Sequence, residues 1–352
     1  MKIVNAVYGD STGGRWAATL KTGRLLAGRG HEVILLIDPV DAPKVPAEDA
    51  AVMELVTLKN SGHFDAIASW KAGRLLRERG IDAVIAHSGR AIHMLKRAAP
   101  RNVPVIAFNH SHNIKRTLKA DAFFCITPYM KAIVDEATGG SKPAFVISNA
   151  ITVPPADVLV PRKDGVFTVG AMGRMVPNKG LHHLVAALGI LARQGVAFQA
   201  TIAGDGEDRA ALEQQAEGAG IRDRIAFPGW IGAEQKAEFY NGLDVMCFTS
   251  ESDVQPLVIL ETLAWGKALI GTDIPGPSTC YTDGETALVV PPGDPEALAA
   301  ALLRLRNEPG LRARLGAAAR RKAIECHADE VVAEFLDARL REVVDSMAVK
   351  KG

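Results

Sequence analysis

A short loop with two positive charges is the clearest chemical feature of the sequence. Residues 173–180 read GRMVPNKG and present Arg174 and Lys179 between a predicted strand and a predicted helix. The free N–H groups at a helix start favour an anion, arginine bonds phosphate bidentately, and lysine adds a point charge. The loop therefore predicts a diphosphate-binding site. The alternative is a basic loop that only faces solvent.

A lone carboxylate lies in the apolar segment PLVILETLAW, residues 256–265. Glu261 is its only charge, and Pro256 suits the first position of a helix. Because a buried carboxylate is costly without a partner, we expect Glu261 to meet a fixed donor. That donor is either a neighbouring group of the protein or the hydroxyls of a ligand such as a ribose. Asp253, in the preceding loop, could reach a second polar part of that ligand or simply cap the helix.

Two histidines follow a predicted strand in NHSHN, residues 109–113. Their spacing would allow His110 and His112 to share a metal ion, but no third ligand is apparent in the sequence. We therefore expect no metal site. His87 ends an earlier predicted strand, and we expect it either to line the site or to form a hydrogen bond at the strand end.

Parallel α/β units must position these residues. Short apolar strands alternate with longer helical stretches, and the alternation restarts after residues 151–165, a segment with three prolines and no helical periodicity. We expect an α/β protein of two doubly wound domains, residues 1–160 and 161–327. A final amphipathic helix, about 328–352, is expected to cross back and cover the first domain.

Composition narrows the function. The 352 residues are 48% hydrophobic, enough for two cores, and the net charge of +1 excludes the basic excess typical of nucleic-acid coat proteins. Residues 1–165 carry 22 Lys and Arg against 15 Asp and Glu, whereas the remainder carries 19 against 25. No apolar run approaches the roughly 18 residues of a membrane span, so we expect a cytoplasmic protein. No GxGxxG motif follows the first strand, which disfavours a dehydrogenase.

In the order and spacing of its short motifs, the chain resembles the retaining glycosyltransferases of family 4, which have the GT-B fold of two facing Rossmann-like domains. The resemblance extends over nearly the whole chain. The motifs are RGHEV at 29–33, VIAHS at 84–88, PVIAFNHS at 104–111, VISNAI at 146–151, GRMVPNKG at 173–180, IAGDG at 202–206, FPGW at 227–230, the segment 253–261 and VVPPGDPEALAAAL at 289–302.

This resemblance implies roles for individual residues. Arg174 and Lys179 would hold the diphosphate of a nucleotide-sugar donor, and Glu261 its ribose. Asp253 would face the donor sugar, and His110 would lie near the reacting carbon. The other donor-binding residues that the resemblance implies are Gly14, Gly173, Val254, Gln255, Pro256, Leu257, Val258 and Phe227.

The resemblance also implies the reaction: retaining, metal-independent transfer of a sugar from a nucleotide-diphosphate sugar to a hydroxyl acceptor, without a cofactor. Residues 161–327 would bind the donor and residues 1–160 the acceptor, in polysaccharide, lipopolysaccharide or glycolipid synthesis. The basic excess of the first domain would suit an anionic glycolipid or peripheral association with the inner face of a membrane. The alternatives are another GT-B enzyme, such as a nucleotide-sugar epimerase or a phosphorylase, and a non-catalytic nucleotide-sugar-binding module.

Overall fold

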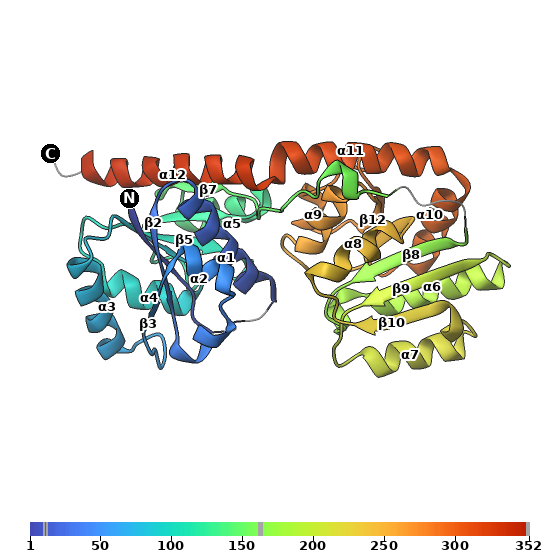
Figure 1. Cartoon of the computed structure of the whole chain (residues 1–352), viewed down its shortest axis with the longest axis horizontal. Helices are drawn as coiled ribbons and strands as arrows, with labels where there is room; N and C mark the ends of the chain where they lie inside the picture. The colour runs from blue at the N-terminus through green and yellow to red at the C-terminus, as the bar shows by residue number, and fades with distance from the viewer. Residues whose placement is uncertain (10, 12, 161–164, 350–352) are drawn as a thin grey trace. The chain divides into compact units, whose positions relative to one another are not determined.

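The computed structural model describes residues 1–9, 11, 13–160 and 165–349, and the chain divides into two compact units. The first unit comprises residues 1–150 and 329–352, and the second comprises residues 151–328 (Figure 1). Each unit has a parallel sheet with helices on its faces, which confirms the expected pair of Rossmann-like folds.

The first unit is built on seven parallel strands in the order β3-β2-β1-β4-β5-β6-β7. Its central strands are apolar throughout because helices cover both faces of the sheet, which buries every residue of β4 and β5. The strands are β1 Lys2–Ala6, β2 Glu32–Ile37, β3 Glu54–Thr57, β4 Ala83–Ala86, β5 Val105–Asn109, β6 Ala122–Cys125 and β7 Ala144–Val146. The helices are α1 Gly13–Gly28, α2 Ala47–Val52, α3 Ala66–Glu78, α4 Gly89–Ala98, α5 Pro128–Thr138 and α12 Asp329–Val349, with the 3₁₀ helix η1 Pro39–Lys44.

The last helix belongs to the first unit, as predicted. Leu336, Leu340 and Val343 of α12 are buried. Lys21 on α1 pairs with Asp329 at 2.7 Å, and the buried His31 lies 2.8 Å from Asp337. Apolar burial and polar contacts such as these therefore hold α12 on this unit. The end of the predicted helix, residues 350–352, lies outside the described residues.

The second unit is built on six parallel strands in the order β10-β9-β8-β11-β12-β13. The strands are β8 Phe167–Met172, β9 Phe198–Ala203, β10 Ile225–Gly229, β11 Val245–Phe248, β12 Ala268–Thr272 and β13 Leu288–Val290. The helices are α6 Leu181–Arg193, α7 Arg209–Gly218, α8 Ala233–Asn241, α9 Leu257–Ala264, α10 Pro295–Asn307 and α11 Pro309–His327, with the 3₁₀ helices η2 Ala156–Val158, η3 Pro177–Lys179, η4 Arg222–Arg224 and η5 Pro277–Thr279.

Two apolar cores flank the second sheet, because successive side chains of a strand point to opposite faces. In β11, Val245 and Cys247 enter one core, whereas Met246 and Phe248 enter the other. Side chains of α6, α7 and α10 complete the first core, those of α8 and α9 complete the second, and α11 contributes to both. This packing fixes the strand ends that carry the predicted site.

The segment predicted as a linker, 151–165, packs with the second unit where it is described. Arg320 donates to the carbonyl of Pro154 at 2.6 Å, and Asn241 donates to the carbonyl of Val158 at 2.9 Å. Residues 161–164, which include the predicted domain start, lie outside the described residues.

Candidate active site

Glycines allow the loops at the carboxyl edge of the second sheet to pack closely against one another. A Cβ on Gly204 would overlap the carbonyl oxygen of Gly173, and a Cβ on Gly206 would overlap that of Met175. Two backbone hydrogen bonds join the same loops: Gly173 N–H donates to Ala203 at 3.0 Å, and Met175 N–H donates to Asp205 at 2.8 Å. The glycines of IAGDG thus allow the loop after β9 to pack against the loop that carries Arg174.

A second close approach positions Lys179. Gly180 has a φ of +61°, and a Cβ there would overlap the carbonyl oxygen of Thr249. The Thr249 hydroxyl donates to the carbonyl of Lys179 at 2.9 Å, and Glu251 N–H donates to Asn178 at 3.0 Å. The loop after β8 is therefore tied to the loop after β11, which carries Asp253.

Lys179 and Asp253 meet as an ion pair. Lys179 Nζ lies 2.5 Å from Asp253 Oδ2, and the two side chains are 22% and 19% exposed. The other carboxylate oxygen of Asp253 accepts a hydrogen bond from Val254 N–H at 2.8 Å. Arg174 is exposed and forms no ion pair within the part of the chain that the structure describes. The structure thus brings together two of the predicted residues and leaves the Arg174 guanidinium available to an anion.

The start of α9 offers backbone donors. The helix begins at Leu257 with Pro256 as its N-cap, one position later than predicted, and no side chain caps it. A left-handed Gly276, with a φ of +94°, lets the loop after β12 pack on the carbonyl of Val254. Gln255, the next residue, is buried. An uncapped helix start beside a lysine favours binding of an anion.

Glu261 has partners within the protein that the sequence did not reveal. Lys236 on α8 donates to its Oε1, and the Tyr240 hydroxyl lies 3.3 Å from its Oε2. Tyr240 is fully buried and stacks on Trp265 at 5.3 Å, and burial together with the Glu261 charge raises its pKa well above the ordinary value. The expected fixed donor is therefore Lys236, and Glu261 keeps a 15% exposed side chain.

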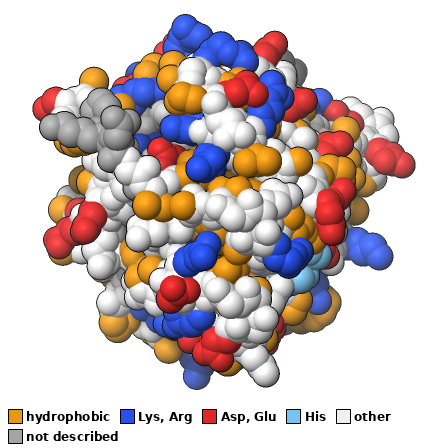
Figure 2. Space-filling view, turned by 90° about the vertical axis from the view of Figure 1, so that its right-hand side faces the viewer, with side chains coloured by type: hydrophobic (Ala, Val, Ile, Leu, Met, Phe, Trp, Pro, Cys, Tyr) orange, Lys and Arg blue, Asp and Glu red, His pale blue; other side chains and the backbone are white. Residues whose placement is uncertain are grey.

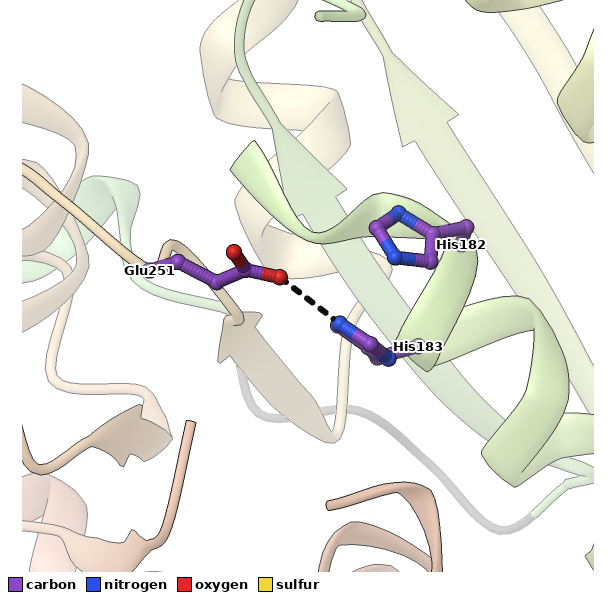
Figure 3. A group of neighbouring side chains, drawn as sticks. All are labelled: His182, His183 and Glu251. Carbon is purple, nitrogen blue, oxygen red and sulfur yellow. Dashed lines mark hydrogen bonds and ion pairs between the residues drawn. The ribbon is translucent and has the colours of Figure 1, made fainter. Parts of the chain in front are cut away.

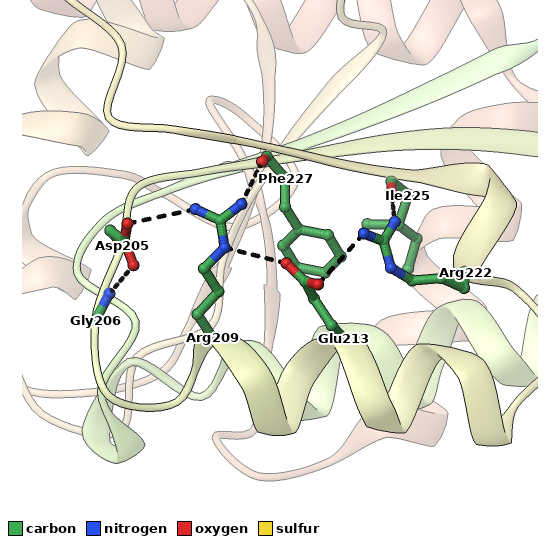
Figure 4. A network of polar contacts seen from close by, with 7 residues as sticks. All are labelled: Asp205, Gly206, Arg209, Glu213, Arg222, Ile225 and Phe227. Atoms are coloured by element: carbon green, nitrogen blue, oxygen red, sulfur yellow. Dashed lines mark hydrogen bonds and ion pairs between the residues drawn. The ribbon is translucent and has the colours of Figure 1, made fainter.

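The predicted donor-binding residue Phe227 has its ring in a core. It is 9% exposed, and the Arg222 guanidinium covers the ring at 5.1 Å. Its carbonyl accepts a hydrogen bond from Arg209 at 2.8 Å, and Arg209 also bonds Asp205 and Glu213 (Figure 4). This network fixes the ends of β9 and β10. It leaves the backbone of Phe227, rather than its side chain, at the edge of the sheet.

In the first unit, a chain of hydrogen bonds sets the tautomer of His110. Asn5 Nδ2 donates to the carbonyl of Thr19 at 2.8 Å, so Asn5 Oδ1 must accept from His87 Nε2, 2.8 Å away. A neutral His87 then accepts at Nδ1 from His110 Nε2, also at 2.8 Å. His110 Nδ1 is consequently left as a hydrogen-bond acceptor.

Both imidazoles are neutral at physiological pH. Burial, with a smaller contribution from the Arg15 charge, lowers the pKa of His110 to about 3. Burial likewise lowers the pKa of His87 well below its ordinary value. His110 is therefore a neutral hydrogen-bonding group rather than a cation. Gly14, in the first turn of α1, is exposed with open space around its α carbon.

The histidines weighed as metal ligands separate in the structure. His110 stacks on His87, whereas His112 packs edge-on against Tyr129 at 5.3 Å. Among the described residues, the group of three that could hold a metal ion is instead His182, His183 and Glu251 (Figure 3). His183 Nε2 already bonds Glu251 at 2.8 Å. Both imidazoles lie in the first turn of α6, where the helix dipole opposes a cation.

No helix within the described ranges is both long enough and apolar enough to cross a membrane.

Comparison with known proteins gives a consistent result. Residues 12–153 match the family model Glycosyltransferase Family 4, and residues 160–322 match Glycosyl transferases group 1. The chain is 30% identical over 323 residues to the lipopolysaccharide core biosynthesis glycosyltransferase LpsD of Rhizobium meliloti, covering 90% of this chain and 91% of LpsD. It is 27% identical to LpsE of the same organism over 90% of this chain and 92% of LpsE.

Solved structures agree on the fold. HepE of Anabaena in complex with UDP aligns with a TM-score of 0.82 at 18% identity, over 97% of this chain and 100% of HepE. Two Rossmann-like sheets with a C-terminal helix that returns to the first unit define a protein of the GT-B class. The chain belongs to glycosyltransferase family 4, and it is a glycosyltransferase.

Proposed function

We propose that this enzyme transfers a sugar from a nucleotide-diphosphate sugar to a hydroxyl of a sugar, glycolipid or lipid-linked acceptor. The observation that carries the proposal is the Lys179–Asp253 pair beside the uncapped start of α9 and the exposed Arg174. HepE, a structural neighbour, binds UDP and UDP-glucose, and LpsD and LpsE act in lipopolysaccharide core synthesis.

The donor contacts follow from the chemistry of the carboxyl edge. Arg174 and Lys179 bind the diphosphate together with the N–H groups of Leu257 and Val258. Glu261 accepts from the ribose hydroxyls, sharing its carboxylate with Lys236. Gly173, Pro256 and the backbone of Phe227 shape the loops around the nucleotide.

A bound diphosphate changes the partner of Lys179. The anion attracts the ammonium, so Asp253 loses part of its ion pair and can accept from a hydroxyl of the donor sugar. The turn of Val254 and Gln255 holds Asp253 in place during this exchange, because Val254 N–H already bonds one of its oxygens.

The transfer step is retaining and leaves charge on the diphosphate. The bond between the anomeric carbon and the phosphate oxygen breaks, and the acceptor oxygen bonds that carbon from the same face. The departing diphosphate takes the acceptor's proton. Arg174, Lys179 and the α9 dipole stabilise the negative charge that develops, so no metal ion or cofactor is required. In the first unit, His110 offers a neutral imidazole, and Gly14 leaves open space at the start of α1.

We place the acceptor with the first unit and the enzyme at the cytoplasmic face of a membrane, where peripheral association through the basic first unit brings it to its acceptor. No nucleic-acid partner is expected.

A thermal-shift panel tests the proposal. UDP, GDP, ADP and dTDP, each alone and with a common sugar attached, are added to the wild type and to Glu261→Ala. We expect one nucleotide to raise the melting temperature of the wild type selectively and to lose most of that effect in Glu261→Ala. No shift with any nucleotide would contradict the assigned donor site.

A further inference from the structure

Three large apolar side chains are exposed where α3 begins. Phe64 is 75% exposed, Ile67 70% and Trp70 63%. Ile67 and Trp70 are one turn apart on the helix, and Phe64 lies in the loop immediately before it. The opposite side of α3 is buried through Ala68, Ala72 and Leu76. A cluster of exposed apolar side chains of this size marks an interaction surface.

The loop holds this cluster in a fixed position. Asp65 caps α3 by accepting from Ala68 N–H at 2.8 Å, and its other oxygen accepts from Ser61 N–H and from the Ser61 hydroxyl. The Phe64 ring packs edge-on against His93 at a centroid distance of 6.0 Å. Phe64 is therefore presented to solvent by an ordered turn.

The surrounding chain is strongly basic. Residues 59–119 contain twelve Lys and Arg against three Asp and Glu. The three acids are already engaged: Asp65 caps α3, Glu78 pairs with Arg74 at 2.6 Å, and Asp82 accepts from the N–H of Lys2. Nine of the twelve cations form no ion pair with any described residue, namely Lys59, Lys71, Arg77, Arg90, Arg97, Arg101, Lys115, Arg116 and Lys119.

Several of these cations lie near the apolar cluster. The ring of His93, which contacts Phe64, also contacts His63 at 5.2 Å. Burial chiefly, and then the charges of Arg116 and Lys119 among others, lowers the pKa values of these two histidines. The positive field therefore reaches the base of the apolar cluster.

This combination fits one kind of partner. Apolar and aromatic side chains bind at the boundary between headgroups and acyl chains, and the cations around them bind anionic headgroups. A second copy of this chain would bring like charges together. The surface of the second unit differs from the basic surroundings of α3. On the face of the second unit shown in Figure 2, Lys and Arg side chains lie next to Asp and Glu side chains.

We propose that Phe64, Ile67 and Trp70, with the unpaired cations Arg90, Arg97, Arg116 and Lys119, form a membrane-docking surface that inserts into an anionic lipid bilayer. We call it the α3 docking surface. The inference builds on the proposed lipid-linked acceptor and membrane association, but it does not depend on the identity of the donor.

Vesicle binding tests the docking surface. The full chain is sedimented with vesicles of phosphatidylethanolamine and phosphatidylglycerol, and separately with phosphatidylcholine vesicles. We expect the wild type to bind the anionic vesicles and not the phosphatidylcholine vesicles. The triple variant Phe64→Ser/Ile67→Ser/Trp70→Ser should bind the anionic vesicles at least tenfold more weakly. Binding should also weaken as salt rises from about 0.05 to 0.5 M, because screening shortens the reach of the cations. Trp70 emission should shift to shorter wavelength on binding, and Trp70→Phe should lose that shift.

Matched variants distinguish binding through the α3 docking surface from nonspecific binding through other exposed apolar side chains. Phe335 on α12 and Ile324 on α11 are also exposed, at 55% and 44%, so Phe335→Ser/Ile324→Ser removes apolar side chains elsewhere and should bind vesicles like the wild type. The charge variant Arg97→Gln/Arg116→Gln/Lys119→Gln should bind anionic vesicles several-fold more weakly.

Three results would overturn the inference: equal vesicle binding by the wild type and the apolar triple variant, no binding at low salt, or binding of single-stranded RNA that only the charge variant weakens. Nucleotide thermal shifts are measured on the same proteins and should be unchanged in every surface variant. Normal nucleotide shifts with no vesicle binding would refute the docking surface alone. Vesicle binding without any nucleotide shift would refute the donor site alone.

Discussion

The carboxyl edges of the two sheets differ in charge although six strands of each sheet follow the same order. The edge of the second sheet carries the Lys179–Asp253 and Lys236–Glu261 ion pairs and the exposed Arg174. The edge of the first sheet carries His87 and His110, which burial keeps neutral. The shared fold places side chains at equivalent strand ends, and the loops decide whether those side chains are charged.

The difference matches the ligand that we propose for each edge, a donor diphosphate at the second sheet and an acceptor hydroxyl at the first. A diphosphate leaving group needs fixed positive charge, whereas a sugar hydroxyl needs a hydrogen-bonding group of defined tautomer. Substitutions at one edge should therefore have effects that substitutions elsewhere do not have.

The largest effect is expected for Lys179→Ala. The variant loses a fixed cation at the leaving diphosphate and leaves Asp253 without its partner, so kcat/KM should fall by about 10²–10³-fold. Nucleotide release in the presence of donor and acceptor measures it. Arg224→Ala is the control, because Arg224 lies at the amino end of β10 against Phe198 and should leave turnover unchanged. If Lys179→Ala turns over as fast as Arg224→Ala, the carboxyl edge of the second sheet does not bind the diphosphate through Lys179.

Gly204→Ala should destabilise the second unit by about 2–4 kcal/mol. Its φ is +124°, and a Cβ would overlap the carbonyl oxygen of Gly173, so the loops of the charged edge would have to separate. Chemical denaturation measures the change. In the control Gly218→Ala, the added Cβ meets open space at the end of α7 and should be neutral or stabilising.

Glu261→Gln should raise the dissociation constant of the nucleotide by about 10–100-fold, because ribose loses a charged acceptor and Lys236 loses its partner. Calorimetric titration measures this change. Glu238 lies exposed on the same helix as Lys236, so Glu238→Gln should bind as the wild type does. A Glu261→Gln protein with unaltered affinity would exclude the ribose contact.

The lowered pKa of His110 should affect how the free energy of unfolding depends on pH. The folded-state pKa of His110 is about 3, below an unfolded value of about 6.5, so its contribution to stability is complete above about pH 6.5 and is lost as the pH falls. The free energy of unfolding should fall by about 1–2 kcal/mol from about pH 7 to about pH 5 through this group. The slope should be shallower in His110→Gln. Identical slopes would show that folding does not lower the pKa of His110.

Local sequence patterns predicted the parts of the structure that depend on nearby residues. Alternating apolar strands and helices predicted two parallel sheets, and the glycines and cations of residues 173–180 predicted the charged loop. β3, Glu54–Thr57, is a short edge strand with mostly exposed side chains, so burial does not mark it as it marks the central strands.

The contacts that escaped prediction join residues far apart in the chain. Lys236 reaches Glu261 only because α8 and α9 pack side by side in one core. The Asn5–His87–His110 chain requires β1, β4 and β5 to be neighbours in the sheet. The exposure of Trp70 likewise depends on which side of α3 packs against the protein, and helical spacing alone does not reveal that.

The most direct test is a calorimetric titration of the full-length wild type and Lys179→Ala, without added metal, using UDP, GDP, ADP and dTDP in turn. The account predicts that one of these nucleotides binds the wild type and binds Lys179→Ala at least tenfold more weakly, while Arg224→Ala behaves as the wild type. Equal affinity of the wild type and Lys179→Ala for the bound nucleotide would contradict the assignment of the charged edge as the donor site.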